Sequence, residues 1–427
     1  MPPFQLFAKA FDPGLPAAAF SMQWQNPGDV FSVLLLLGGD VISRALAQLA
    51  GTKSLLAPVA FSFGWVAFSV TALLSAVGEN KLMPAPDTSC LVINGRSGYA
   101  RNNCSWLIAR LVRDYEHWMP PQTRLHLQSM LDQRWEENKE TAARKHMAKQ
   151  QQPKSYLPCA PMLPFDATSI ARPTQASLCV TVFAAGARHP APPARDAVYL
   201  SGFATQLVQL GVAAVPYAVF DDWGVLVVTG AGIALAMATG ALPQWRREKW
   251  ACRRDSDKAV VLTRGNGAQH ALVVLGEGRG LDLEDLAAGP ANLDLSASRP
   301  TVAAVMALSA LWIALLVTAA GLRAHTWFLV AVGGIGMLQN IYVAGARRRP
   351  DAAGVPLEFR EVVDETKVFD TLLEVERKYP RLGKSMLDTF FPGGHLTNEE
   401  RARWAEVEAK GEDAEDGAWG ADHQVYT

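Results

Sequence analysis

The sequence predicts an α-helical polytopic membrane protein, with six transmembrane helices in three hairpins and a small composite α/β cytoplasmic domain. Three observations predict this fold class: the length of the apolar stretches, the short gaps that join them in pairs, and the placement of Lys and Arg. Each stretch has about 20 residues, enough for a helix to cross ~30 Å of hydrocarbon at about 1.5 Å per residue. The stretches cover residues 30–50, 56–77, 198–219, 223–242, 302–321 and 326–345.

The gaps within each pair of stretches are very short, at residues 51–55, 220–222 and 322–325. Such gaps permit only tight connections, so each pair is expected to form a helical hairpin. Beyond residue 399 the chain is acidic and poor in large apolar side chains apart from Trp404 and Trp419, which predicts a tail that is partly helical and then disordered. The predicted domains are an N-terminal segment at 1–29, transmembrane hairpins at 30–77, 198–242 and 302–345, long segments at 78–197, 243–301 and 346–398, and a disordered tail at 399–427.

The basic residues predict the orientation of the chain. The hairpin gaps carry only Lys53 and Arg323, whereas the long segments carry runs of Lys and Arg. Because Lys and Arg are retained on the cytoplasmic side, the long segments and both termini are expected in the cytoplasm. The protein is then a multi-pass protein of the plasma membrane or the endomembrane system. Asn103 begins an N-x-S sequon that this orientation leaves without a glycan.

The long segments contain signals for strands and helices. Strands are expected at 89–94 and 178–184, and a hairpin at 259–263 and 270–275, because Asn266-Gly267 suits the positive φ of a hairpin turn. Helices are expected at 105–118, 122–150, 281–288, 364–379 and 381–390. Isolated hairpins are marginal in water. We therefore expect strands of the first and second long segments to meet in one domain.

Composition excludes several classes of function. The net charge is −1 over 427 residues, so no basic excess predicts nucleic-acid binding. The five cysteines show no C-x-x-C spacing, and the eight histidines form no catalytic or zinc-binding pattern. The sequence therefore predicts reduced thiols, no metal, no cofactor and no catalytic residue, and it leans away from an enzyme. The mean hydropathy of +0.07 is low because the polar segments dilute the apolar ones.

Asp40 and Arg44 are the sharpest signal within the apolar stretches. They lie four residues apart, on one face of a helix, where they can form an ion pair. Charged groups at the bilayer centre cost about 2.5–3.5 kcal/mol each, so they normally face protein or water. One interpretation is an ion or solute pathway. The other is a self-neutralised pair that fixes helix packing, with Arg44 reaching toward the interface.

Uncharged amides form a second intramembrane set: Gln206, Gln209, Gln339 and Asn340. Amides in membranes often bond between helices, at about 0.6–2 kcal/mol each. Packing is the plain interpretation, and the alternative is that they line a polar cavity together with Asp40. Glycines in several of the same stretches, among them Gly232 and Gly336, suit close helix packing.

Two basic clusters directly follow apolar stretches. The first contains Arg246, Arg247, Lys249, Arg253 and Arg254, with Trp245 and Trp250 among them. The second is Arg347, Arg348 and Arg349. Both suit anionic lipid headgroups on the cytoplasmic face, each charge contributing ~1 kcal/mol near the surface. The plain alternative is topological anchoring without a specific lipid.

Four strings of residues resemble a family of uncharacterised multi-spanning membrane proteins of filamentous fungi. They are LLLLGGDVI at 34–42, SAVGENKLMP at 75–84, LTRGNGAQH at 262–270 and GGIGMLQN at 333–340. The resemblance covers nearly the whole chain. It implies a membrane protein and no particular chemistry, because the family has no assigned activity.

The sequence does not determine the function, and three hypotheses follow from it. The leading one is a non-enzymatic membrane protein whose cytoplasmic domain binds partners or lipid headgroups. The second is a transporter or channel for a small solute or ion that uses Asp40, Arg44 and the intramembrane amides. The weakest is a membrane-bound lipid enzyme, which lacks a nucleophile, a metal set or an acid–base pair.

Overall fold

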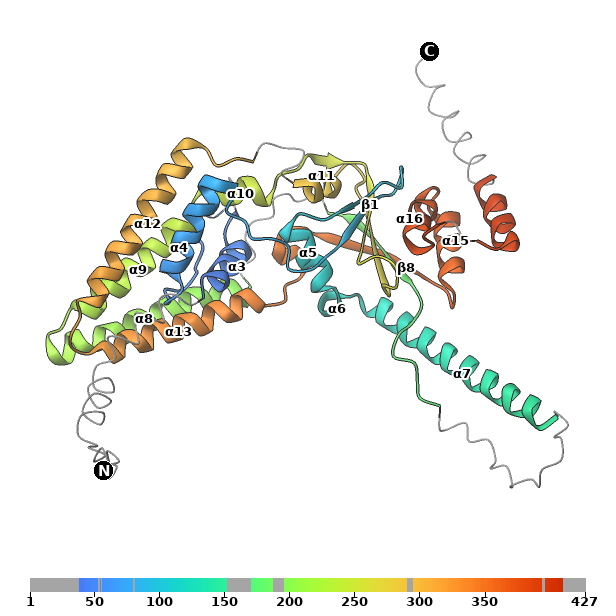
Figure 1. Ribbon diagram of the computed structural model, residues 1–427, viewed down its shortest axis with the longest axis horizontal. Coiled ribbons are helices and arrows are strands. Elements are labelled where there is room, and N and C mark those ends of the chain that lie inside the picture. The colour runs from blue at the N-terminus through green and yellow to red at the C-terminus, as the bar shows by residue number, and fades with distance from the viewer. Residues whose placement is uncertain are drawn as a thin grey trace, which may run out of the picture. The chain divides into compact units, whose positions relative to one another are not determined.

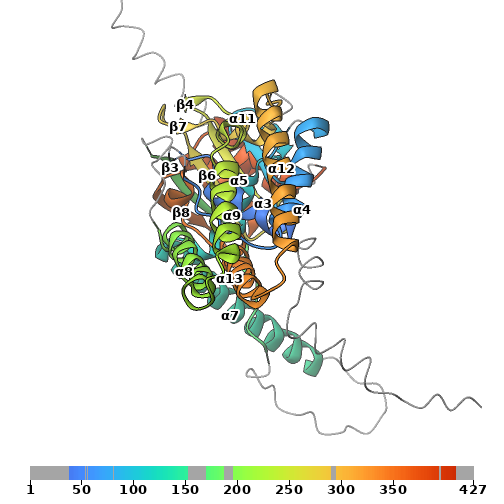
Figure 2. The ribbon, with the colours of Figure 1, turned by 90° about the vertical axis from the view of Figure 1, so that its left-hand side faces the viewer.

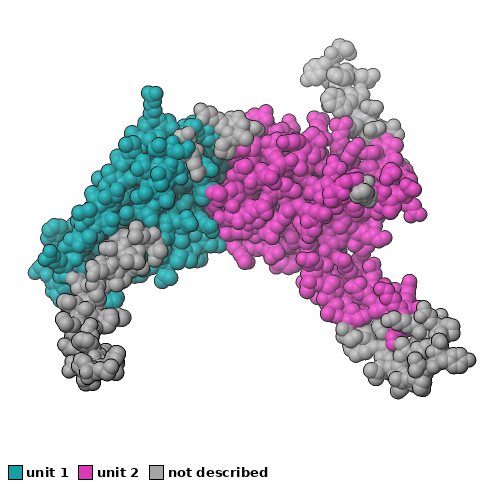
Figure 3. All heavy atoms as spheres, viewed as in Figure 1, with its two compact units in different colours: residues 1–84, 192–250, 294–346 teal, residues 85–191, 251–293, 347–427 magenta. Residues whose placement is uncertain are grey.

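The computed structural model describes residues 38–52, 54, 56–79, 81–151, 170–186, 196–289, 295–393 and 396–409. The chain divides into two compact units (Figure 3). The helical unit comprises residues 1–84, 192–250 and 294–346, and the sheet unit comprises 85–191, 251–293 and 347–427. Each unit is therefore assembled from three separate pieces of the chain.

The helical unit is dominated by α8 (Ala197–Phe220), α9 (Gly224–Gly240), α12 (Arg299–Ala320) and α13 (Thr326–Gly345) (Figures 1 and 2). Among the described residues, α8, α12 and α13 are long and apolar enough to cross a membrane. A fourth candidate is α9 together with α10 (Pro243–Lys249), which follows after a bend of 41°. Helix α8 packs against α9 and α13, and α12 packs against α9.

The ends of these helices follow from local side-chain chemistry. Asp196 precedes α8 and its carboxylate accepts a hydrogen bond from the backbone N–H of Tyr199. Ser298 does the same for α12, where its hydroxyl accepts from the N–H of Thr301. Such N-caps satisfy backbone donors that the first helical turn leaves unpaired.

The first predicted hairpin differs from the structure. Helix α3 spans Gly39–Leu49, and residues 30–37 of the predicted first span lie outside the described residues. The expected continuous helix at 56–77 is wrong: residues 56–64 are not helical, and α4 begins at Trp65 and ends at Leu74. A π-helical turn, Ser75–Glu79, extends it. Pro58 disfavours the helical conformation for the residue before it, Ala57, and favours extended backbone there.

The described part of the sheet unit contains a six-stranded sheet in the order β2-β1-β5-β6-β3-β8. Strands β3 and β6 are parallel, and the other neighbours are antiparallel. Strands of the first and second long segments do meet, in the pairs β1–β5 and β3–β6. The third long segment adds β8, which the sequence analysis did not expect. The strands are β1 (Leu91–Asn94), β2 (Ala100–Asn102), β3 (Cys179–Ala185), β5 (Ala259–Thr263), β6 (His270–Leu275) and β8 (Leu357–Asp364).

Several local predictions are confirmed. The expected hairpin forms between β5 and β6 with the predicted bounds, and Gly265 and Gly267 in its turn have φ of 98° and 80°. Helix α11 (Leu283–Ala288) is capped by Asp282, whose carboxylate accepts from the N–H of Asp285. A short second sheet pairs β4 (Arg254–Ser256) with β7 (Gly280–Leu281).

Helices cover both faces of the sheet. Alternate residues of β3 point to opposite faces and therefore contact different helices. Val180 and Val182 belong to the core formed with α15 (Val368–Lys378) and α16 (Leu382–Phe390). Cys179 packs instead with Leu127 of α7 (Pro121–Gln151), and Thr181 bonds the hydroxyl of a tyrosine in α6. This is the period of two that a strand requires when both faces are covered. The remaining helices are α5 (Trp106–Arg113), α6 (Tyr115–Trp118) and α14 (Pro350–Ala353).

The first part of the predicted tail is helical, as expected. Residues 398–409 form a helix, and residues 410–427 lie outside the described residues. Trp404 is 5% exposed and packs against Phe369 of α15, with ring centroids 5.9 Å apart. The lone tryptophan on an otherwise acidic segment therefore belongs to the core of the sheet unit.

Replacement of Trp404 by alanine should destabilise the sheet unit by about 3–5 kcal/mol, because it removes a buried aromatic side chain and leaves a cavity. The control is Glu399→Ala, since Glu399 is exposed on the same helix. Denaturant unfolding of the full-length protein measures both. Equal midpoints for the two variants would show that the helix does not contribute to the core.

Candidate functional site

The predicted intramembrane amides converge on one short piece of backbone. Residues 57–63 form no helix, yet every one of them is buried inside the helical unit. An extended segment cannot satisfy its own N–H and C=O groups as a helix does. Its hydrogen bonds must come from other elements.

Asn340 of α13 supplies bonds in both directions. Its Oδ1 accepts from the backbone N–H of Ala60 at 3.1 Å, and its Nδ2 donates to the carbonyl of Ala60 at 2.9 Å. The same Nδ2 donates to the Ser62 hydroxyl at 3.0 Å. The indole N–H of Trp65 also reaches the Ala60 carbonyl, at 2.9 Å. Asn340 thus pairs with Ala60 as a neighbouring strand would.

Two glutamines of α8 bind the segment from another direction. Gln206 donates to the carbonyl of Val59 at 3.2 Å. Gln209 donates to the carbonyl of Phe61 at 2.6 Å and to that of Val332 in α13 at 2.9 Å. Gln339, the fourth predicted amide, lies elsewhere: it is partly buried and donates to the hydroxyl of Ser201 at 2.8 Å. The structure therefore brings three of the four amides together.

The longer piece of chain from Gly51 to Met83, which contains the extended segment, is bound at both ends by α10 and the residue after it. At the first end, the carbonyl of Gly51 accepts from the indole N–H of Trp250, which directly follows α10. At the second, the N–H groups of Leu82 and Met83 donate to the carboxylate of Glu248 in α10, at 2.7–2.9 Å. Between these ends the chain reaches the middle of α12, where Trp65 stacks on Trp312 with centroids 5.0 Å apart. The chain therefore goes in as an extended segment and returns as α4.

Glycine makes this close packing possible. A Cβ on Gly336 of α13 would overlap the carbonyl oxygen of Phe61, and a Cβ on Gly202 of α8 would overlap that of Pro58. Only residues without a side chain allow helix backbones this near to the segment. The sequence indicated close approach at Gly336 correctly, but its partner is the extended segment.

Asp40 and Arg44 lie on exposed faces of α3, with Asp40 in its first turn. The ion pairs recorded for the described residues include none between these two side chains, and their pairing stays a prediction. Neither residue contacts the amides around residues 57–63 among the described hydrogen bonds. The structure thus separates the charged and the uncharged parts of the predicted polar set.

Lys249, predicted to contact lipid headgroups, instead lies 4% exposed against the end of α3. Its Nζ donates to the carbonyls of Ala47, Gln48 and Ala50 at 2.8, 3.3 and 3.0 Å. A helix leaves its last carbonyls unpaired and has a negative end, so a buried ammonium group fits there. The headgroup prediction for Lys249 is wrong for this reason.

The other members of the basic clusters are more accessible. Arg246 and Arg247 are exposed on α10, and Arg347 and Arg349 are exposed after α13, where Arg348 is partly buried. Arg254 is exposed in β4. Arg253 is exposed but is bound by Asp285 through two hydrogen bonds of 2.6 and 3.0 Å. Contact with lipid by these arginines stays a prediction.

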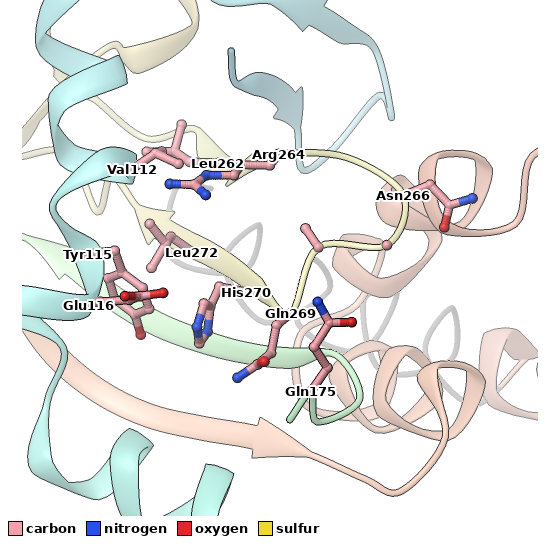
Figure 4. A pocket seen from close by; sticks show the side chains of 12 residues that line it. Val112, Tyr115, Glu116, Gln175, Leu262, Arg264, Asn266, Gln269, His270 and Leu272 are labelled. Atoms are coloured by element: carbon pink, nitrogen blue, oxygen red, sulfur yellow. The ribbon is translucent and has the colours of Figure 1, made fainter. Parts of the chain in front are cut away.

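The sheet unit carries a pocket that sequence reasoning missed. It has a volume of about 370 Å³ and lies between α5–α6 and the end of the β5–β6 hairpin (Figure 4). Its apolar lining includes Val112, Leu262 and Leu272. Its polar lining comprises Tyr115, Glu116, Gln175, Arg264, Asn266, Gln269 and His270.

His270 occupies the centre of this lining (Figure 4). Burial lowers the pKa of His270 to about 4; the charge of Glu116 opposes this shift and that of Arg264 adds to it. The imidazole is therefore neutral near pH 7 and offers one N–H donor and one acceptor. Its ring lies edge-on to Tyr115, with centroids 5.1 Å apart. The Tyr115 hydroxyl is held by Thr181 at 2.7 Å.

Part of the pocket lies in a predicted element: Arg264 and Asn266 belong to the hairpin turn, and His270 begins its second strand. Glu116 and Gln175 come from distant parts of the chain, so no local pattern connects them to the hairpin. The pairing of β3 with β6 brings Gln175 there, and the contacts of Tyr115 with Thr181 and His270 bring Glu116 there.

Four of the five cysteines lie among the described residues, where they form no disulfide. Within the described residues, no group of His, Cys, Asp and Glu could hold a metal ion. Burial raises the pKa of Cys90 and of Cys179 to about 12, so both stay protonated near pH 7. Cys159 lies outside the described residues.

Replacement of Asn340 by leucine should destabilise the helical unit by about 1–3 kcal/mol, because the N–H of Ala60 then lacks a buried acceptor. The matched control is Gln339→Leu, the adjacent amide, which makes its hydrogen bond to a side chain and leaves no backbone group unpaired. Thermal unfolding in lipid nanodiscs compares the two. If Gln339→Leu lowered the melting temperature more, the extended segment would not depend on Asn340.

Replacement of Lys249 by methionine should lower stability by about 1–2 kcal/mol, because three carbonyls of α3 lose their donor while the side-chain volume is nearly kept. Arg247→Met is the control, since Arg247 is exposed on the same short helix. The measurement is the melting temperature in nanodiscs of neutral lipid. A loss that appears only with anionic lipid would instead support the headgroup prediction.

No family model, curated protein or solved structure matches this chain. The resemblance to a fungal membrane-protein family therefore stays a prediction. The function has to be inferred from the two units themselves.

Proposed function

We propose that this protein is a membrane-anchored binding protein, whose helical unit anchors it and whose sheet unit binds a small polar ligand in the pocket around His270. The pocket carries the proposal. Its volume of about 370 Å³ is within the usual range for ligand sites, and its apolar lining with a few convergent polar groups is their usual composition. The structured sheet unit also accounts for the large share of the chain outside the apolar helices.

The anchor has at least four spans in this proposal: α8, α9 with α10, α12 and α13. Residues 57–79 form a re-entrant segment, because both its flanks bind α10 and its deepest part reaches the middle of α12. Irregular backbone at membrane depth is tolerated where protein buries it, as here. This replaces the predicted second span.

The orientation follows from charge and aromatic residues. Arginines follow α9–α10 and α13, which favours a cytoplasmic location for those ends. At the opposite helix ends, Tyr217, Trp223 and Trp327 are 53%, 64% and 43% exposed, as expected of an aromatic belt at a membrane interface. We propose that the segments forming the sheet unit are cytoplasmic.

A membrane anchor is favoured over a transport pathway because the intramembrane amides already form hydrogen bonds to the backbone. The side-chain amides of Gln206, Gln209 and Asn340 donate hydrogen bonds to the backbone carbonyls of residues 59–61. A solute pathway needs polar groups that face a cavity and exchange partners. These amides face protein.

Transport of a small solute is the second candidate, and the extended backbone at membrane depth is the observation that favours it. Transporters often place broken helices near their substrate sites. The Oε1 of Gln209 is buried beside this segment and has no hydrogen-bond partner among the described residues. Asp40→Asn and Gln209→Leu would then abolish a flux into proteoliposomes while the protein stays folded.

The proposed function is tested by ligand-induced stabilisation of the full-length protein in nanodiscs. The panel contains small anions, cations, zwitterions and neutral polar metabolites. Saturation at about 100 times Kd adds about 2.7 kcal/mol, a shift of several °C in melting temperature. We expect at least one compound to stabilise the wild type but not Ala268→Trp, which fills the pocket. Ala100→Trp, an exposed alanine in β2, is the control.

Two results would contradict this function. One is stabilisation that Ala268→Trp leaves intact, which would place the ligand elsewhere. The other is the absence of any stabilising compound combined with a proteoliposome flux that Gln209→Leu abolishes, which would favour the transporter.

A further inference from the structure

We infer that the pocket of the sheet unit takes a small zwitterion, an amino acid with an apolar side chain, whose carboxylate meets Arg264 and whose ammonium group meets Glu116. The inference rests on the proposed function and names the ligand class of the same pocket. It follows from the charges of the lining, the apolar surface between them and the neutral donors and acceptors nearby.

The lining contains one guanidinium group and one carboxylate. Arg264 of the hairpin turn and Glu116 of α6 both line the pocket that contains His270 (Figure 4). No ion pair or side-chain hydrogen bond joins either charge to another described residue, and both side chains are exposed. Two opposite charges that flank one pocket without pairing offer a counter-charge to each end of a zwitterion.

The same charges disfavour the simpler ligand classes. Phosphate monoesters and dicarboxylates carry about two negative charges near pH 7, and Glu116 repels them while only Arg264 attracts. A cationic amine is repelled by Arg264 in the same way. The formal charge of the lining is zero when His270 is neutral, which matches a ligand of zero net charge.

The rest of the lining matches the remainder of an amino acid. Val112, Leu262 and Leu272 provide apolar surface for a side chain, and the Tyr115 and His270 rings can pack against an aromatic one. Gln175 and Gln269 supply further amide donors and acceptors at the same pocket (Figure 4). The volume of about 370 Å³ is at the small end for ligand sites, which suits a single amino acid.

The test is calorimetric titration of the full-length protein in nanodiscs with L-phenylalanine and L-leucine. Two analogues of phenylalanine each remove one charge: 3-phenylpropanoate lacks the ammonium group and 2-phenylethylamine lacks the carboxylate. We expect at least one amino acid to bind the wild type, and each analogue to bind at least tenfold more weakly than phenylalanine where phenylalanine binds.

Charge-removing variants assign the two ends of the ligand. Arg264→Gln should weaken phenylalanine and 3-phenylpropanoate alike, by tenfold or more. Glu116→Gln should weaken phenylalanine but leave 3-phenylpropanoate unchanged or tighter, because the repelling carboxylate is gone. The controls are Arg96→Gln and Glu358→Gln, exposed residues of the same unit outside the pocket, which should bind as the wild type does.

The outcomes separate this inference from the proposed function. If 3-phenylpropanoate binds as tightly as phenylalanine, or if neither variant changes binding, the zwitterion inference is overturned and the pocket keeps another ligand. If neither amino acid binds while another compound stabilises the wild type and not Ala268→Trp, the ligand class is wrong and the proposed function stands. If nothing binds in either experiment, both fall.

Discussion

The hydrogen bonds of a short extended segment determine how the helical unit is built. Residues 57–63 are buried among apolar helices, where an unpaired N–H or C=O costs several kcal/mol. Asn340, Gln206 and Gln209 supply the missing partners, and glycines at the facing positions let the backbones come near enough. If these amides were absent, the extended segment would have to become helical or leave the interior.

This arrangement also changes the meaning of polar residues in apolar helices. A buried amide is commonly interpreted as part of a pathway, yet here its partners are backbone groups. Lys249 follows the same principle, since its ammonium group serves three carbonyls at the end of α3. In both cases an irregularity of the main chain explains the polar side chain.

Sequence reasoning predicted the local elements well and the non-local contacts poorly. The β5–β6 hairpin was found because Asn266-Gly267 encodes its turn, and α8, α12 and α13 were found because long apolar runs have few alternatives. The segment 56–64 was misassigned because apolarity alone does not distinguish a helix from a buried extended chain. Strand β8 was missed although its residues alternate, and the pocket was missed because Glu116 and Arg264 are 148 positions apart in the chain.

The strand order also determines when the sheet can be completed during translation. Strand β3 lies between β6 and β8, and about 170 residues separate the end of β3 at Ala185 from the start of β8 at Leu357. At about 5–20 residues per second, translation takes roughly 10–30 s to cover that distance. Throughout this interval one edge of β3 lacks its partner, and an open apolar edge attracts other strands. The nascent chain therefore keeps this edge of β3 unpaired until the last long segment emerges from the ribosome.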